Sequence, residues 1–402
     1  MSKQTLRFRS ILFWPHLVVG LAAGLVVFAL SLTGSLLAFE RPILAYSDSV
    51  ALGRVEPSPT RLALSELMPR VQTAAGQPVS SITVPADNHL PLMLEAGRDR
   101  IFLVDPYRGT VVGPASPGLR TFFRQVTALH RWFGFSDAAH KTVLLIKGWF
   151  TLAFVFLILS GWYLWLPATW TPAALRVRMR PRWAATARAR EFNWHHSFGL
   201  WFSLPLLVIA LTGVVMALPW ANQLLFSVTG SPLPQAREGK QPEGRAEQTK
   251  GAKQHSAHAG HSNAAPAPDY DRPDYDRMVQ TASNQQSGWR NLQIRVPGGE
   301  VRSAQIIVDR GNGAQPQRRD TLVFDPSGNL VRTDLFAQQS LGRKSRLVGR
   351  FLHTGEIFGF VGEFVALLAC LAGMLLVYTG ISLSIRRFTR KAAPIKREIP
   401  VS

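Results

Sequence analysis

The stretch HLVVGLAAGLVVFALSLTG, residues 16–34, decides the fold of this chain, and it recurs as HHSFGLWFSLPLLVIALTG at residues 195–213. With His16 aligned on His195, both runs reach a Thr-Gly pair at the same position without a gap. Each run is uncharged over more than ~18 residues, the length of a membrane-spanning helix. A histidine inside such a helix is costly and therefore indicates a functional site. Two equivalent helices with a histidine at the same depth predict a ligand held between them.

The composition places the chain among membrane proteins. Its 402 residues include one cysteine, Cys370, which excludes an internal disulfide and a CxxCH site for covalent haem. The formal net charge of +20 is of the kind found in nucleic-acid-binding proteins. Much of this charge, however, borders long apolar runs, which is how membrane topology is encoded. We therefore expect the lipid bilayer, and no nucleic acid, as a partner.

Four apolar runs predict four transmembrane helices, which cover residues 11–40, 136–167, 195–221 and 353–385. The first is about twice as long as the apolar region of a signal peptide, so we expect a retained helix after a cytoplasmic segment, residues 1–10. The loop 168–194 carries six arginines against one acidic residue, and the tail 386–402 is also basic. Both features are typical of cytoplasmic segments.

Two polar segments, residues 41–135 and 269–345, are predicted to lie on the exported side. In each, a helical period precedes short alternating runs with turn signals, and Asp105-Pro106 of the first matches Asp325-Pro326 of the second. The predicted architecture is therefore an α-helical membrane protein with four transmembrane helices from an internal duplication and two small α+β domains. Residues 231–268 are rich in Pro, Gly, Gln and Ala, which predicts a disordered linker. A solvated spacer is the favoured interpretation of its three histidines, and metal binding is the alternative.

The duplication also pairs the histidines. His16 pairs with His195 near the cytoplasmic face, and His130 pairs with His353 near the exported face. Neutral imidazole is a good ligand for haem iron, and two imidazoles from facing helices can occupy both axial positions. The four histidines therefore predict two b-type haems, one near each face. Glycines about one turn away are expected to let the flat macrocycle approach the backbone: Gly20, Gly134, Gly199 and Gly359.

Two other histidines compete for these roles. His196 adjoins His195 and points about 100° away around the helix, so only one of the two can easily serve. His140 lies nearer the membrane than His130 in the sequence. Contacts with a substrate or with haem propionates are one interpretation of a cationic and aromatic group near the exported face: Arg343, Lys344, Arg346, Arg350 and Trp132. A solvated helix face is the alternative interpretation of the basic residues.

The sequence contains no recognisable binding motif for a nicotinamide, flavin or nucleotide. It contains no GxGxxG after a strand, no GxxxxGK[ST], no HExxH and no GxSxG. A redox function must therefore draw electrons from a partner, either a quinol or a cytoplasmic reductase.

Several short motifs occur in order along the chain: the HxxxG start of the first and third spans, LHRWFG before the second, FLHTGEIFG before the fourth, and the Asp-Pro turns. With these motifs the chain resembles the PepSY-associated transmembrane family and, within it, the iron-regulated siderophore reductases. The resemblance covers the chain except the linker. It implies a bacterial inner-membrane protein with periplasmic domains, an inner haem on His16 and His195, an outer haem on His130 and His353, and ferric siderophore as the substrate. Reduction would release the metal, because hard oxygen donors bind Fe(II) far less tightly than Fe(III).

Two functions from other classes remain as alternatives. In the first, the exported domains bind or regulate exported peptidases and the helices only anchor them. In the second, the chain transports metal or haem with the help of the linker histidines. The redox interpretation alone requires bound haem, which separates it from the first alternative.

Overall fold

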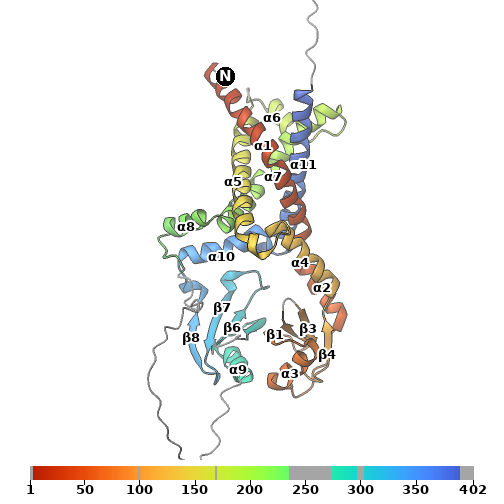
Figure 1. Ribbon diagram of the computed structural model, residues 1–402, viewed down its shortest axis with the longest axis vertical. Helices are drawn as coiled ribbons and strands as arrows, with labels where there is room; N and C mark the ends of the chain where they lie inside the picture. Colours follow the sequence, from red (N-terminus) through yellow and green to blue (C-terminus); the bar gives the residue numbers. More distant parts are fainter. Residues whose placement is uncertain (1–2, 98–99, 168–169, 235–272, 297–302, 390–402) are drawn as a thin grey trace, which may run out of the picture.

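Four long apolar helices form a bundle that stands on a β-sheet (Figure 1). The computed structural model describes residues 3–97, 100–167, 170–234, 273–296 and 303–389. The helices of the bundle are α1 (Lys3–Leu37), α5 (His140–Trp165), α7 (Ala187–Ala217) and α11 (Phe360–Phe388). Within the described part of the chain, four helical segments containing these helices are long and apolar enough to cross a membrane. The prediction of four spans is therefore confirmed.

The bundle helices are arranged as a ring. Helix α1 packs between α5 and α11, and α7 packs between the same two helices on the opposite side. Small residues allow close approach of the helices: Ala210 of α7 and Ala369 of α11 are almost fully buried in the bundle core. Close packing between small side chains is the main attraction available to helices in lipid, where burial of apolar surface adds little.

Several helix ends differ from the predicted spans. Helix α7 begins eight residues before the predicted third span, so Glu191 lies in a helix rather than in a loop. The same helix ends at Ala217 because Pro219 starts a separate short helix, α8 (Pro219–Val228). The predicted fourth span is divided before α11, because Gly355 and Gly359 adopt positive φ angles of 78° and 61° that end the preceding helix.

Short helices connect the bundle to the sheet. At this level lie α2 (Glu40–Leu52), α4 (Pro117–Trp132) and α10 (Leu341–His353), together with α8 (Figure 1). At the other end of the bundle, α6 (Pro172–Met179) begins at Thr171, whose side chain accepts a hydrogen bond from the N–H of Ala174. The sequence patterns did not predict α2, α4 or α10 as separate helices, and α4 and α10 are the two that carry His130 and His353.

The sheet has eight antiparallel strands in the order β4-β3-β2-β1-β5-β6-β7-β8. The first half contains β1 (Val79–Pro85), β2 (Leu92–Ala96), β3 (Arg100–Val104) and β4 (Val111–Pro114); the second contains β5 (Asn291–Arg295), β6 (Ala304–Asp309), β7 (Arg319–Phe324) and β8 (Leu330–Asp334). Strands β1 and β5 join the halves, with Ile82 opposite Ile294. The structure thus differs from the prediction of two separate domains. Each half would otherwise leave a strand edge unpaired, and the β1–β5 pairing removes both edges.

One hydrophobic core serves both halves of the sheet. It includes Leu67 of α3 (Leu64–Ala75) and Met278 of α9 (Tyr275–Gln285), both fully buried. The two helices are also linked directly, because Asp276 of α9 accepts a hydrogen bond from the N–H of Leu64 at 2.8 Å. The carboxylate of Asp276 thereby pairs with an N–H group in the first turn of α3, where the helix has no acceptor of its own.

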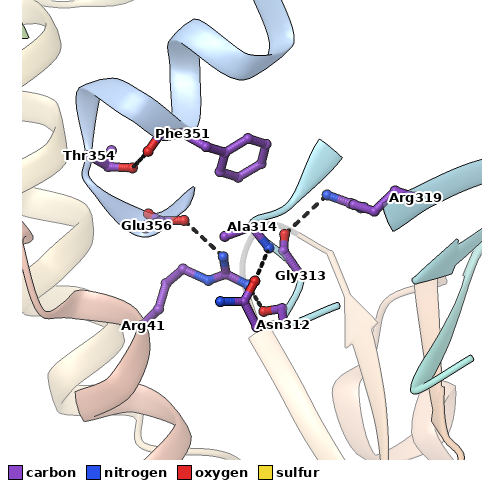
Figure 2. A network of polar contacts seen from close by, with 8 residues as sticks. All are labelled: Arg41, Asn312, Gly313, Ala314, Arg319, Phe351, Thr354 and Glu356. Carbon is purple, nitrogen blue, oxygen red and sulfur yellow. Dashed lines mark hydrogen bonds and ion pairs between the residues drawn. The ribbon is translucent and has the colours of Figure 1, made fainter. Parts of the chain in front are cut away.

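A polar network ties the sheet to the bundle (Figure 2). Arg41, at the start of α2, forms an ion pair of 2.8 Å with Glu356, which follows α10. The same guanidinium donates to the carbonyl of Asn312 at 3.1 Å, in the loop between β6 and β7. Arg319 donates to the neighbouring carbonyl of Gly313 at 3.2 Å, and burial lowers the pKa of Arg319. This network fixes the sheet beneath the end of the bundle where α10 terminates at His353.

Part of the predicted organisation lies outside the described residues. This applies to residues 235–268 of the predicted linker, with its three histidines, and to residues 390–402 of the basic tail. The described start of that tail, Arg386 and Arg387, lies in the last turn of α11.

Candidate cofactor site

The structure brings His130 and His353 together at the end of the bundle next to the sheet; we call them the sheet-side pair. Their ring centres lie 6.4 Å apart, and their planes are inclined by 62°. Metal–imidazole bonds of about 2 Å place the centres of two rings on opposite sides of one ion about 6 Å apart. The separation therefore fits two axial ligands of a single metal.

His16 of α1 and His195 of α7 form a second pair, the distal pair. Both helices run from the far end of the bundle toward the sheet, and both histidines lie in their N-terminal halves (Figure 1). Helices α1 and α7 stand opposite each other in the ring of helices, so His16 and His195 lie toward the same end of the bundle on opposite sides. The chain thus has two of these histidines toward each end of the bundle.

All four histidines are held by a hydroxyl group from another helix. The Nδ1 atom of His16 lies 2.8 Å from Oγ of Ser160, and that of His195 lies 3.0 Å from Oγ1 of Thr379. At the sheet-side pair, the same contacts are 2.8 Å for His130 with Thr33 and 3.0 Å for His353 with Thr212. Each imidazole therefore uses Nδ1 for a hydrogen bond and leaves Nε2 available for a metal.

A glycine follows each of these hydroxyl residues and lies under the same imidazole ring. A Cβ atom added to the glycine would stand 3.4–3.6 Å from the Cε1 atom of the histidine in all four cases. We call each Ser/Thr-Gly dipeptide a seat, and the seats are Thr33-Gly34 for His130, Ser160-Gly161 for His16, Thr212-Gly213 for His353 and Thr379-Gly380 for His195. Each of the four bundle helices contributes one seat.

Two of the seats are absent from the sequence interpretation. Thr33-Gly34 and Thr212-Gly213 mark the repeat, but Ser160-Gly161 and Thr379-Gly380 carry no prediction. A Ser/Thr-Gly pair in every apolar span was the signal that could have identified them.

The four glycines that were expected to face a macrocycle lie instead in helix contacts or at helix ends. Gly20 lies against Leu157 and Gly199 against Leu376, so both support helix packing. Gly134 and Gly359 adopt positive φ angles after α4 and before α11.

The competing histidines have different surroundings. His196 donates from Nδ1 to the carbonyl of Phe192 in its own helix at 2.8 Å and has no hydroxyl-glycine seat. His140 uses Nε2 for the carbonyl of Phe135 at 2.9 Å and stacks on Trp132 with ring centres 4.1 Å apart. The structure therefore favours His195 over His196 and His130 over His140 as metal ligands.

The predicted cationic group lies on α10, and most of its members are already engaged. Lys344 donates to the carbonyl of Ala337 at 2.6 Å, and Arg346 donates to the side chain of Asn222 at 2.9 Å. Arg350 lies over the ring of Phe351, while Arg343 is exposed. Trp132 is occupied by its stack with His140. The four cationic residues share α10 with His353 of the sheet-side pair.

Two charged groups near the pairs were missed in the sequence. Lys147 of α5 donates to the carbonyls of His130 and Arg131 at 3.4 and 3.3 Å, which places a cation beside the sheet-side pair. At the far end of the bundle, the buried carboxylate of Glu191 accepts hydrogen bonds from Ser382 at 2.8 Å and Arg386 at 3.0 Å. Glu191 precedes His195 by one helical turn.

The donor set suits a metal that brings its own equatorial ligands. The described residues contain no group of three or more His, Cys, Asp or Glu side chains that could hold a bare ion. Each pair offers two imidazoles, and the two imidazoles of a pair would hold a haem iron, which brings its own equatorial ligands. The four histidines are thus arranged as one pair toward each end of the bundle.

Comparison with protein families gives one result for nearly the whole chain. The model described as the PepSY-associated TM region matches residues 13–387. A search of curated proteins found no match. Together with the four apolar helices, the family match identifies a multi-pass membrane protein.

Proposed function

The chain belongs to the family of the PepSY-associated TM region, and we propose that it is a di-haem b protein of the bacterial inner membrane that reduces ferric siderophores in the periplasm. The observation that supports this proposal is the presence of two histidine pairs, the sheet-side pair and the distal pair, toward opposite ends of one bundle. We also infer that the chain arose by duplication, since each half supplies two seats, two seated histidines and four strands in the same order.

The spacing of the two pairs suits electron transfer across a membrane. From His16 to Thr33, which holds His130, α1 advances 17 residues, or roughly 25 Å along its axis. The same interval separates His195 from Thr212 on α7. The hydrocarbon layer is about 30 Å thick, so two haems at these depths divide it into short steps. When bound, each haem supplies a one-electron Fe(III)/Fe(II) couple.

The protein's own groups perform the positioning. Helices α1 and α7 hold the distal pair where electrons enter from a quinol or a cytoplasmic reductase. Helices α4 and α10 hold the sheet-side pair, and the Arg41–Glu356 ion pair fixes the end of α10 against the sheet. The exposed side chains of Arg343 and Arg350 on α10 offer hydrogen-bond donors to an oxygen-rich ferric chelate at the sheet-side end of the bundle.

The experiment that tests this function is an anaerobic reoxidation. Dithionite-reduced protein is mixed with a ferric hydroxamate siderophore and ferrozine as the ferrous trap. The wild-type protein is expected to reoxidise and to form the ferrous complex. His353→Ala should retain the distal haem and lose reoxidation by the chelate, whereas His16→Ala should block electron entry from the opposite end.

His89→Ala is the matched control, because His89 is exposed in a turn between β1 and β2. This substitution is expected to leave the rates of haem reoxidation and of ferrous-complex formation unchanged. If the wild-type haem reoxidises no faster than that of His353→Ala and no ferrous complex forms, the reductase function is wrong. Binding of exported peptidases by the sheet then becomes the leading alternative.

A further inference from the structure

The hydroxyl groups of the four seats share a second hydrogen bond. Each one donates to the carbonyl four residues earlier in its own helix. The pairs are Thr33 with Ala29 at 2.7 Å, Ser160 with Phe156 at 2.7 Å, Thr212 with Val208 at 2.7 Å and Thr379 with Leu375 at 2.8 Å. This back-bonding is common for Ser and Thr inside transmembrane helices.

The hydrogen bond from the hydroxyl to the carbonyl determines which atom donates in the hydrogen bond between the hydroxyl and the imidazole. A hydroxyl group has one proton, and here that proton is committed to a backbone carbonyl. The hydroxyl oxygen can then only accept from the imidazole, so Nδ1 of the histidine must carry the hydrogen. The neutral ring consequently has its lone pair on Nε2, the nitrogen that remains free to bind a metal.

We propose that Thr33, Ser160, Thr212 and Thr379 are positioning residues that hold the four histidines in the Nδ1–H tautomer and aim Nε2 at the haem iron. The inference rests on the proposed di-haem function and deepens it, because it assigns two hydroxyls to each haem. Ser160 and Thr379 serve the distal haem, and Thr33 and Thr212 serve the sheet-side haem. An accepted Nδ1–H bond also raises the basicity of the ligand, which favours Fe(III) over Fe(II).

The four hydroxyls differ in importance, because some of the histidines have a second hydrogen-bond acceptor near Nδ1. Nδ1 of His353 also lies 2.9 Å from the carbonyl of Ile209, and the carbonyls of Leu30 and Leu376 are second partners of His130 and His195. For His16, the described residues provide the hydroxyl oxygen of Ser160 as the acceptor. Loss of the hydroxyl should therefore matter most at Ser160 and less at the other three positions.

The test is a redox titration of purified full-length variants, followed through the visible haem bands. Ser160→Ala is expected to raise the midpoint potential of the distal haem and to weaken its affinity by about 10- to 100-fold, while the sheet-side haem is unchanged. Ser160→Thr keeps the hydroxyl and should restore both values. Thr212→Val should produce a smaller shift, because the carbonyl of Ile209 still accepts from Nδ1 of His353.

Ser203→Ala is the matched control. Ser203 is a buried serine of α7 that donates to a carbonyl of its own helix at 2.7 Å but holds no imidazole. If Ser160→Ala fails to fold, Thr379→Val reports on the opposite ligand of the same haem. A distal midpoint that stays at the wild-type value in a haem-loaded Ser160→Ala or Thr379→Val protein overturns the inference and leaves the di-haem function intact. A wild-type protein that binds no haem overturns the proposed function itself.

Discussion

Enlarging the glycine of a seat should remove one haem and spare the other, and Gly380 provides the clearest case. A Cβ atom at Gly380 would stand 3.5 Å from Cε1 of His195, an ordinary contact distance, so Gly380→Ala should keep both haems. Valine adds γ-carbons about 1.5 Å farther out, which can approach the ring to about 2 Å. The imidazole of His195 must then move by an amount comparable to a metal–nitrogen bond. Overpacking of this kind costs about 1–3 kcal/mol, or roughly a 5- to 150-fold loss of affinity for the distal haem.

Haem titration of the purified variant, resolved by the separate redox midpoints of the two haems, measures this loss. Gly24→Val is the matched control, because a Cβ at Gly24 would meet only the side chains of Val377 and Ile381, at 3.5 and 3.7 Å. That variant should lose a similar amount of stability and keep both haems. If Gly380→Val binds the distal haem as tightly as Gly24→Val does, the glycine of the seat does not set the position of His195.

The remaining predictions concern the sheet and its attachment to the bundle. Asp276→Ala removes the acceptor for the N–H of Leu64 and should lower the free energy of unfolding of the sheet by about 0.5–2 kcal/mol in urea-dependent proteolysis; an unchanged midpoint would contradict the cap. Ile294→Ala should cost about 2–5 kcal/mol in the same assay, because its side chain is fully buried opposite Ile82 at the junction of the two halves. Unfolding of only one half in that variant would show that the two halves do not share a core. Hydrogen bonds from the backbone and side chain of Asn329 hold the pKa of Asp325 below its usual range, so this turn is fully stabilised above the ordinary carboxyl pKa and loses that contribution as the pH falls through the lowered value. Asn329→Ala should therefore raise the pKa measured by carboxyl ¹³C titration, and an unaltered pKa would exclude the side-chain bond.

The spans and the histidine pairing could be predicted from the sequence because they depend on local composition. The uncharged nineteen-residue stretches that begin at His16 and at His195 determine both the helices and the depth of each imidazole. His130 and His353 are assigned to the same end for a similar reason, since each precedes an apolar run.

The seats were not predictable in this way. Whether Ser160 faces His16 depends on the rotation of α5 against α1, which tertiary packing sets and periodicity does not. The single sheet was missed for a related reason: Gln293 and Ser81 are hydrogen-bonded neighbours although 212 residues separate them. The short helices α4 and α10 escaped prediction because each is amphipathic and reads as a polar segment.

The haem content of the purified full-length protein, determined by the pyridine haemochrome method, tests the di-haem function directly. We predict about two non-covalent b-type haems per chain, one remaining in His16→Ala and one in His353→Ala, with the residual haem at a different midpoint potential in the two variants. A colourless protein from haem-replete cells, or equal haem content in the wild type and both variants, would contradict the di-haem function.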